Sequence, residues 1–256
     1  SIFYGTVGND LMGGFLIDFA NKQNIKAAYL NISLNRNTTL AFVDIDENGE
    51  RNFCFYRKHT ADYDLKPIRQ IDLKNANIVH FGSLMLSEEE GFEYALNEIK
   101  RVRSLGKYIS FDINFRTDIF KNEEEALDRY KTILKYVDIV KFSEDEVNIF
   151  GKAYVKNLSQ HALVCVSLGN KGSKYIYRGL TNIIPSIKVK PIDTTGAGDA
   201  FFAAILMNLD GINSNEWNKE LLDKIFKFAN IAGALTTLKV GAIDGLPSSE
   251  EIKKYY

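Results

Sequence analysis

The chain has 256 residues, of which 45% are hydrophobic and 25% charged, and its formal net charge is −1 at pH 7. This balance is typical of a globular protein with a sizeable core, and it offers no basic excess for nucleic acid or for an anionic membrane. No uncharged apolar stretch approaches the length of about 18 residues that a membrane-spanning helix needs. Cys54 and Cys165 lie in strand-like apolar patterns, so we interpret both as buried thiols in a reducing compartment.

The first distinctive element along the chain is a hairpin. Two β-rich runs, residues 39–45 and 52–57, flank the dipeptide Asn48-Gly49, which is typical of a tight hairpin turn. The hairpin stands between a helix pattern and a regular series of strands and helices. We therefore interpret residues 30–62 as a small β lid, and a core strand as the alternative.

From residue 78 onward, strand and helix patterns alternate. The strand patterns lie at residues 78–82, 108–112, 137–141 and 163–168, and amphipathic helix patterns lie at residues 87–104 and 123–135. Short apolar runs separated by helices indicate βαβ units and a mainly parallel sheet that is covered on its faces. The sequence therefore predicts an α/β protein.

Polar residues follow the second of these strands. Asp112, Asn114 and Arg116 occupy alternate positions, which point to one side in an extended chain. Ligands of parallel α/β sheets bind beyond the carboxyl ends of the strands. The three side chains are therefore candidates for holding a polyhydroxylated substrate or its phosphate, and a solvated loop with a local ion pair is the alternative.

The ends of the next two strands each allow two interpretations. Ser143 and Glu146 fit the S-x-x-E capping box, and Glu146 is also suitable for ordering a hydrated Mg²⁺ ion. Ser167, Gly169 and Gly172 are suitable for lining a nucleotide, and they equally fit a hairpin turn into the next strand.

A glycine-rich stretch, I-D-T-T-G-A-G-D-A-F-F, occupies residues 192–202. The apolar run that begins after Asp199 is typical of a buried helix, and Gly196 and Gly198 let the backbone approach a ligand closely. The free N–H groups and the dipole of such a helix end bind anions. Asp199 is then either a general base beside an anion or a plain N-cap, and the local sequence does not decide between them.

Other nucleotide and metal motifs are excluded. The pattern G-x-G-x-x-G fails because Phe201 replaces the third small residue, and this argues against a nicotinamide-dependent oxidoreductase. No Walker A loop occurs in the sequence, and its three histidines lack the spacing of metal ligands.

Taken in order, these stretches resemble the PfkB, or ribokinase-like, family of sugar kinases. Residues 193–199, D-T-T-G-A-G-D, match the family's C-terminal signature at every position, and G-T-V-G-N-D at residues 5–10 resembles its G-x-V-G-x-D stretch. The resemblance implies a three-layer α/β/α sandwich with a mainly parallel central sheet and a small β lid. It implies a single kinase domain over residues 1–256, and we expect the family's N-terminal strand region, with its sugar contacts, to precede this sequence.

Within the family the chain is most similar to fructokinases, through residues 38–42, 55–57, 80–83 and 141–146. The resemblance implies transfer of a phosphoryl group from ATP, with Mg²⁺, to a primary hydroxyl of a ketose, and fructose is the expected substrate. A 2-keto-3-deoxygluconate kinase and a ribokinase stay open, because the arginines also suit a sugar acid. A non-catalytic sugar- or nucleotide-binding protein is the alternative from another class.

The resemblance also implies roles for single residues. Asp199 becomes the general base, and the backbone of Gly196, Ala197, Gly198 and Asp199 forms the anion hole. The implied sugar contacts are Arg57, Asp112, Asn114, Arg116 and Asp199. The implied ATP contacts are Lys141, Ser167, Gly169, Gly172, Gly196, Gly198 and Asn230. Glu146 is expected to order the waters of Mg²⁺, Asp193 and Thr195 to hold K⁺, and the lid to form a homodimer of a cytoplasmic enzyme.

Overall fold

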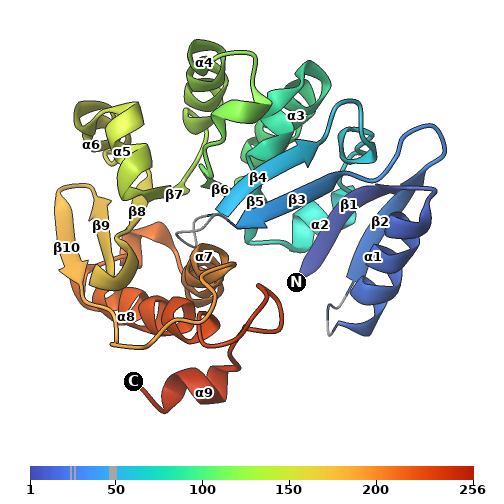
Figure 1. Cartoon of the computed structure of the whole chain (residues 1–256). Coiled ribbons are helices and arrows are strands. Elements are labelled where there is room, and N and C mark those ends of the chain that lie inside the picture. Colours follow the sequence, from blue (N-terminus) through green and yellow to red (C-terminus); the bar gives the residue numbers. More distant parts are fainter. Residues whose placement is uncertain (24, 26, 46–50) are drawn as a thin grey trace. The chain divides into compact units, whose positions relative to one another are not determined.

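The chain folds into two compact units, seen in a computed structural model that describes residues 1–23, 25, 27–45 and 51–256 (Figure 1). Unit 1 comprises residues 1–76, 84–105 and 116–133, and unit 2 comprises residues 77–83, 106–115 and 134–256. The predicted turn at Asn48-Gly49 lies outside the described residues. The single domain over residues 1–256 stays a prediction.

Unit 1 is built from two small sheets and several helices. Its strands are β1 (Ile2–Gly8), β2 (Ala27–Ser33), β3 (Leu40–Ile45) and β4 (Arg51–Tyr56). Its helices are α1 (Leu11–Lys22), η1 (Ala61–Tyr63), α2 (Gln70–Asn75), η2 (Leu84–Ser87), α3 (Glu89–Ser104), η3 (Thr117–Ile119) and most of α4 (Glu123–Leu134). β1 and β2 pair in parallel, whereas β3 and β4 form the predicted antiparallel hairpin as a sheet of their own. Cys54 on β4 is exposed, so its predicted burial is wrong.

Unit 2 contains a six-stranded sheet in the order β10-β9-β8-β7-β6-β5. Its strands are β5 (Ile78–Phe81), β6 (Tyr108–Asp112), β7 (Ile139–Ser143), β8 (Leu163–Ser167), β9 (Ser173–Tyr177) and β10 (Leu180–Ile184). The four strands β5 to β8 are parallel, and β9 and β10 are antiparallel additions at one edge. The predicted mainly parallel sheet is confirmed. β7 begins two residues later than the predicted 137–141 and ends at Ser143, so Lys141 lies at its centre and not at its end.

Helices cover both faces of this sheet (Figure 1). They are α5 (Glu144–Phe150), α6 (Lys152–Leu158), α7 (Ala197–Leu209), α8 (Lys219–Thr236) and α9 (Ser249–Lys253), with the short helices η4 (Gly169–Lys171) and η5 (Ser214–Glu216). Side chains alternate between the faces along a strand. Ile139 on β7 packs in one cluster with α7 and α8, whereas Phe142 meets Phe150 of α5 with ring centroids 5.4 Å apart. Unit 2 is therefore a helix–sheet–helix sandwich, as predicted.

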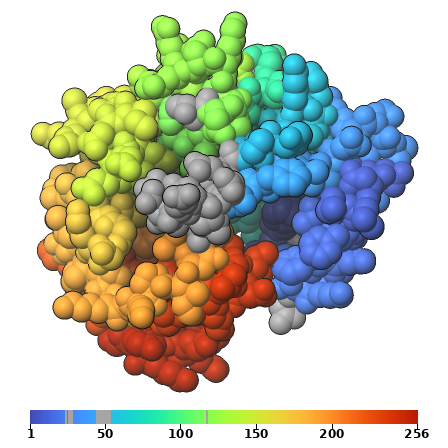
Figure 2. Space-filling view, in the orientation of Figure 1, coloured from blue at the N-terminus to red at the C-terminus, as the bar shows by residue number. Residues whose placement is uncertain are grey.

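Every helix within the described ranges is too short or too polar to cross a lipid bilayer. α7 and α8 instead supply much of the apolar core of unit 2, through residues such as Phe201, Ile205 and Phe226. The segment that leads into α7, orange in Figure 2, reaches the surface of the molecule, and both Ile192 and Asp199 are exposed. A buried helix thus presents its first turn to solvent.

Candidate functional site

α7 begins without a side-chain cap. Its N-cap is Gly196, which has a left-handed backbone conformation with φ at 78°. A β-carbon at this position would also lie 2.7 Å from the Cβ of Ala242, so conformation and space both require glycine. The predicted glycine-rich turn is thus present, but its cap is Gly196 and not Asp199.

The first turn of α7 leaves two backbone donors open. The N–H of Ala197 donates to the carbonyl of Thr194 at 3.3 Å, whereas the N–H groups of Gly198 and Asp199 have no acceptor in the described part of the chain. The amide of Ala197 is therefore less available to an anion than predicted. Unpaired amides at the positive end of a helix dipole are suited to binding an anion, and the anion hole stays a prediction.

Asp199 occupies the third position of α7, three residues after the cap. Its side chain is exposed, and none of the described residues donates a hydrogen bond to its carboxylate. The interpretation of Asp199 as a plain N-cap is therefore wrong. The carboxylate and the two open amides share one helical turn, and the role of Asp199 as general base stays a prediction.

Asp193 fixes the loop that leads into α7. Its Oδ1 accepts the N–H of Thr195 at 2.8 Å, and its Oδ2 accepts the N–H of Gly241 at 2.9 Å. The N–H of Ile192 adds a bond to the carbonyl of Thr237 at 2.7 Å. The structure thus brings together the residues predicted to hold K⁺, although both carboxylate oxygens of Asp193 already bind backbone amides. The K⁺ site stays a prediction.

A buried ion pair lies beside the first turn of α7. Asp112 and Lys141 are registered neighbours on β6 and β7, and Lys141 Nζ donates to both Asp112 carboxylate oxygens at 2.7 and 2.8 Å. A β-carbon at Gly198 would lie 3.5 Å from the same Nζ. Burial raises the pKa of Asp112, the Lys141 ammonium opposes this, and the carboxylates of Glu146 and Asp199 raise it further. The ammonium adds positive charge next to the open amides.

The polar residues after β6 do not form the predicted one-sided row. The strand ends at Asp112, and Asn114 has a left-handed conformation with φ at 37°, so the chain is not extended there. Asn114 belongs to unit 2, whereas Arg116 belongs to unit 1. The prediction that alternation places three side chains on one side is therefore wrong, and sugar binding by Asn114 and Arg116 stays a prediction.

Glu146 forms the capping box that the sequence allowed. Its Oε2 accepts the N–H of Ser143 at 2.6 Å, and its own N–H donates to Ser143 Oγ at 3.2 Å. Its Oε1 accepts the N–H of Phe115 at 2.7 Å, which connects α5 to the end of β6. The described residues contain no group of three or more His, Cys, Asp or Glu placed to hold a metal ion. The Mg²⁺ role of Glu146 stays a prediction.

The segment after β8 is the hairpin turn that the sequence offered as an alternative. Leu168 donates to the carbonyl of Gly172 at 2.9 Å, and η4 begins at Gly169. Gly172 has φ at 105°, and a β-carbon there would lie 2.1 Å from the carbonyl oxygen of Ile184. Ser167 donates a hydrogen bond to the carbonyl of Phe142 at 3.4 Å. The predicted ATP contacts of this segment remain predictions.

Asn230 is buried on α8 and is 5% exposed. Its Nδ2 donates to the carbonyls of Ile184 at 2.8 Å and Pro185 at 3.4 Å. These bonds attach α8 to the chain that leaves β10. The structure therefore gives Asn230 a structural part, and its predicted contact with ATP remains a prediction.

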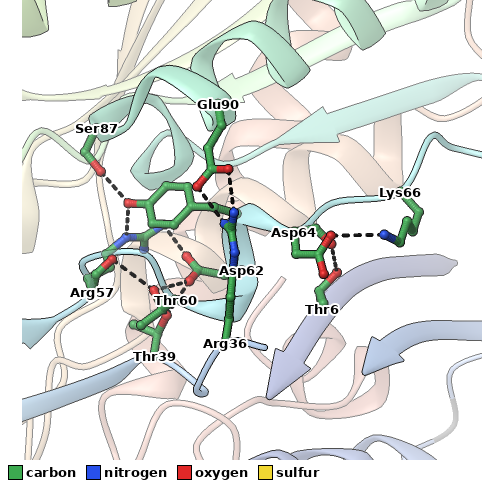
Figure 3. Close-up of polar contacts among 11 residues, drawn as sticks. Thr6, Arg36, Thr39, Arg57, Thr60, Asp62, Asp64, Lys66, Ser87 and Glu90 are labelled. Atoms are coloured by element: carbon green, nitrogen blue, oxygen red, sulfur yellow. Dashed lines mark hydrogen bonds and ion pairs between the residues drawn. The ribbon is translucent and has the colours of Figure 1, made fainter. Parts of the chain in front are cut away.

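Arg57 lies in unit 1, at the base of the β3–β4 hairpin (Figure 3). Its Nε donates to the Tyr63 hydroxyl at 2.9 Å, and its Nη2 lies 2.5 Å from Asp62 Oδ2. The residues joined to this pair are Thr39, Thr60 and Ser87, and together the six residues form what we call the hairpin cluster. Sequence reasoning selected Arg57 but missed Asp62 and Tyr63, because no motif marks them.

The G-x-V-G-x-D stretch ends at Asp10, which is the N-cap of α1. Asp10 Oδ1 accepts the N–H of Gly13 and the hydroxyl of Thr38, both at 2.8 Å, and Oδ2 accepts the N–H of Thr38 at 2.7 Å. These bonds from Thr38 and Gly13 hold the pKa of Asp10 below its usual value. Asp10 therefore joins the start of α1 to the segment before β3.

Comparisons with known proteins agree with this geometry. The profile of the pfkB family of carbohydrate kinases matches residues 1–249. The chain is 33% identical to probable fructokinase-5 of Arabidopsis thaliana, over 99% of this chain and 82% of the relative. The crystal structure of fructokinase with bound ATP from Xylella fastidiosa has a TM-score of 0.91 and 26% identity, covering 98% of this chain and 83% of that one.

A second solved structure is similar over the whole chain. Fructokinase from Vibrio cholerae O395, in a form with bound fructose, ADP and calcium ion, has a TM-score of 0.86 and 29% identity. The alignment covers 100% of this chain and 85% of that one. The predicted ribokinase-like α/β sandwich is confirmed by these similarities.

Proposed function

The chain belongs to the pfkB family of carbohydrate kinases, and on that premise we propose that it transfers the γ-phosphoryl group of ATP to a primary hydroxyl of fructose. The observation that carries the proposal is the first turn of α7, where two open amides adjoin the exposed carboxylate of Asp199. Similarity to fructokinases, including structures with bound ATP or with fructose and ADP, supports this choice of donor and acceptor.

The chemistry follows from the charges at this turn. The amides of Gly198 and Asp199 and the nearby Lys141 ammonium stabilise negative charge that develops on the transferring phosphoryl group. The Asp199 carboxylate accepts the proton of the attacking sugar hydroxyl. Asp112 holds Lys141 in place beneath the helix, because both of its carboxylate oxygens accept hydrogen bonds from Lys141 Nζ.

The cation sites are further parts of the proposal. Mg²⁺ neutralises phosphate charge in such reactions and is held mostly by phosphates and water. Glu146 fits a contact with such waters, since each of its oxygens has one backbone donor and a carboxylate oxygen has room for more. Asp193, Thr195 and the loop at Gly241 would hold K⁺, and the residues around Ser167 and Asn230 would line the ATP site.

The proposal also gives the β3–β4 hairpin a part in sugar binding, in exclusion of water and in dimer formation. Arg57, Asn114 and Arg116 would contact the sugar, and the hairpin would exclude water from the reaction. Phe42 and Tyr56 on the hairpin are 58% and 62% exposed, and their rings meet edge to face at 5.5 Å. This apolar surface supports a homodimer formed through the hairpin. A cytoplasmic location stays a prediction.

The test is ATP turnover with a panel of acceptors: fructose, ribose, 2-keto-3-deoxygluconate, tagatose 6-phosphate and adenosine. We expect fructose to give the highest kcat/KM. A higher value for ribose or for 2-keto-3-deoxygluconate would replace fructose by that acceptor and keep the reaction. ATP-dependent phosphorylation of none of them would overturn the kinase reaction itself.

A further inference from the structure

Arg57 and Asp62 form a largely buried ion pair. The side chains are 11% and 28% exposed, and Nη2 and Oδ2 are 2.5 Å apart. Asp62 is held from the other side by the hydroxyl of Thr60 at 2.6 Å and by that of Thr39. A charge-assisted bond in this setting fixes the guanidinium and compensates its charge.

The second partner of Arg57 is anchored as well. The Tyr63 hydroxyl, which accepts the Nε–H of Arg57, is bonded to Ser87 Oγ at 2.7 Å, and Ser87 is bonded to the carbonyl of Leu84 at 2.8 Å. The guanidinium therefore has two fixed neighbours, one of which is an anion. A substrate that meets Arg57 meets Asp62 at the same time.

The charge of Arg36, a neighbouring arginine, is also balanced by a carboxylate. Arg36 binds Glu90 in a bidentate pair at 2.6 and 2.9 Å, close to the hairpin cluster (Figure 3). Each arginine in this view therefore has its own carboxylate. The hairpin cluster has donors for hydroxyl oxygens, but it has no excess positive charge for an anion.

We propose that Asp62 determines which class of sugar the enzyme accepts: by compensating Arg57 it favours an uncharged ketose and disfavours a sugar acid. A sugar carboxylate at Arg57 would be placed within a few ångströms of Asp62, and like charges repel strongly where water is scarce (effective dielectric of about 20). A hydroxyl oxygen accepts the same N–H groups without this repulsion. The inference rests on the proposed function, because it assumes that Arg57 contacts the sugar.

The test is a change of specificity in the variant Asp62→Asn. Asparagine keeps the shape of the side chain and can still accept from Thr60, but it removes the negative charge. We expect the ratio of kcat/KM for 2-keto-3-deoxygluconate to that for fructose to rise by about tenfold or more, since specificity is a difference between two affinities. A merely structural defect would lower both values and leave their ratio unchanged.

Two variants serve as controls. Glu125→Gln removes the same charge from another arginine-paired carboxylate of unit 1, 2.7 Å from Arg129, and should leave the ratio unchanged. Adding Arg57→Gln to Asp62→Asn should abolish the gain for the sugar acid, because the gain requires the charge of Arg57 without its compensating carboxylate.

The outcomes separate this inference from the proposed function. A wild-type enzyme that phosphorylates neither fructose nor another neutral ketose contradicts the proposed function. A folded Asp62→Asn variant with an unchanged ratio, or an equal rise in Glu125→Gln, overturns the inference alone. If Asp62→Asn does not fold, inhibition of the wild type decides: 2-keto-3-deoxygluconate should compete with fructose about tenfold more weakly than another neutral ketose, and equal competition would overturn the inference.

Discussion

The helices α1 and α7 differ in how the polar groups at their starts are hydrogen-bonded. α1 begins with Asp10, whose carboxylate accepts three hydrogen bonds from Gly13 and Thr38. α7 begins with Gly196, which has no side chain to offer, and Asp199 at the third position of the helix has no donor among the described residues. The open polar groups of α1 are used by the fold, whereas those of α7 are available to a ligand.

This difference has a cost in stability that other contacts must offset. A side-chain cap stabilises a helix by only about a few tenths of a kcal/mol more than a glycine cap does. α7 forgoes this contribution, and its position is secured by Asp193 and by burial of residues such as Phe202 and Ile205. An acidic residue near a helix start is therefore informative about function only when its hydrogen-bond partners are known.

The largest effect is expected from a substitution of Asp199 in the first turn of α7. The variant Asp199→Asn should lower kcat by about 10³- to 10⁴-fold with little change in the KM for ATP, because it removes the proton acceptor and keeps the amides. Its melting temperature should match that of the wild type, since no hydrogen bond to the carboxylate is lost. A loss of kcat below about tenfold would show that Asp199 is not the base.

The next effect tests the ion pair beneath that helix. Lys141→Met leaves the buried Asp112 carboxylate without its partner and should lower the free energy of unfolding by about 3–5 kcal/mol, measured by urea unfolding. The double variant with Asp112→Asn should recover most of this loss. Recovery of none of it would assign the defect to packing of the methionine.

The loss of stability in Lys141→Met should also depend on pH. Burial already raises the pKa of Asp112 in the folded protein above its unfolded value, and removal of the ammonium raises it further. A carboxyl with a raised folded pKa contributes stability below the unfolded pKa and loses it as the pH rises through the folded pKa. Lys141→Met should therefore be less destabilised at pH 5 than at pH 8.

The smallest effect is expected from a substitution of Asp10, the N-cap of α1. Asp10→Ala should lower the free energy of unfolding by about 1–2 kcal/mol and leave kcat unchanged. The pKa of Asp10 is lowered by its donors, so its contribution is present above about pH 4 and is lost as the pH falls through the folded pKa. The difference between variant and wild type should therefore shrink in acid. A difference that is constant with pH would contradict this role.

The local patterns of the sequence predicted the sheet well where strands are bounded by clear signals. β6 occupies the predicted residues 108–112, whereas β7 was placed two residues too early. Asp138, which the apolar pattern included, instead uses its carboxylate to accept the N–H of Ile109 at 2.9 Å. A strand boundary of this kind depends on a neighbouring strand, which a local pattern does not contain.

In the candidate site, too, local motifs were predicted from sequence and contacts between distant residues were not. The motif at residues 193–199 was found from sequence, but the assignment of the helix cap requires the contact between Gly196 and Ala242, which lie far apart in the chain. The pairing of Asp112 with Lys141 likewise depends on the register of β6 and β7. Residue types and motifs could be read locally, whereas partners separated by tens of residues could not.

The contact between Gly196 and Ala242 also has a consequence for sequence variation. The two positions share one small volume, in which the Cβ of Ala242 already occupies the place of a side chain at 196. Ala242 therefore limits the size of residue 196, although it carries no polar group. In a library of all single substitutions, position 196 should tolerate almost nothing but glycine, while Ile243, the exposed neighbour of Ala242, should accept many replacements.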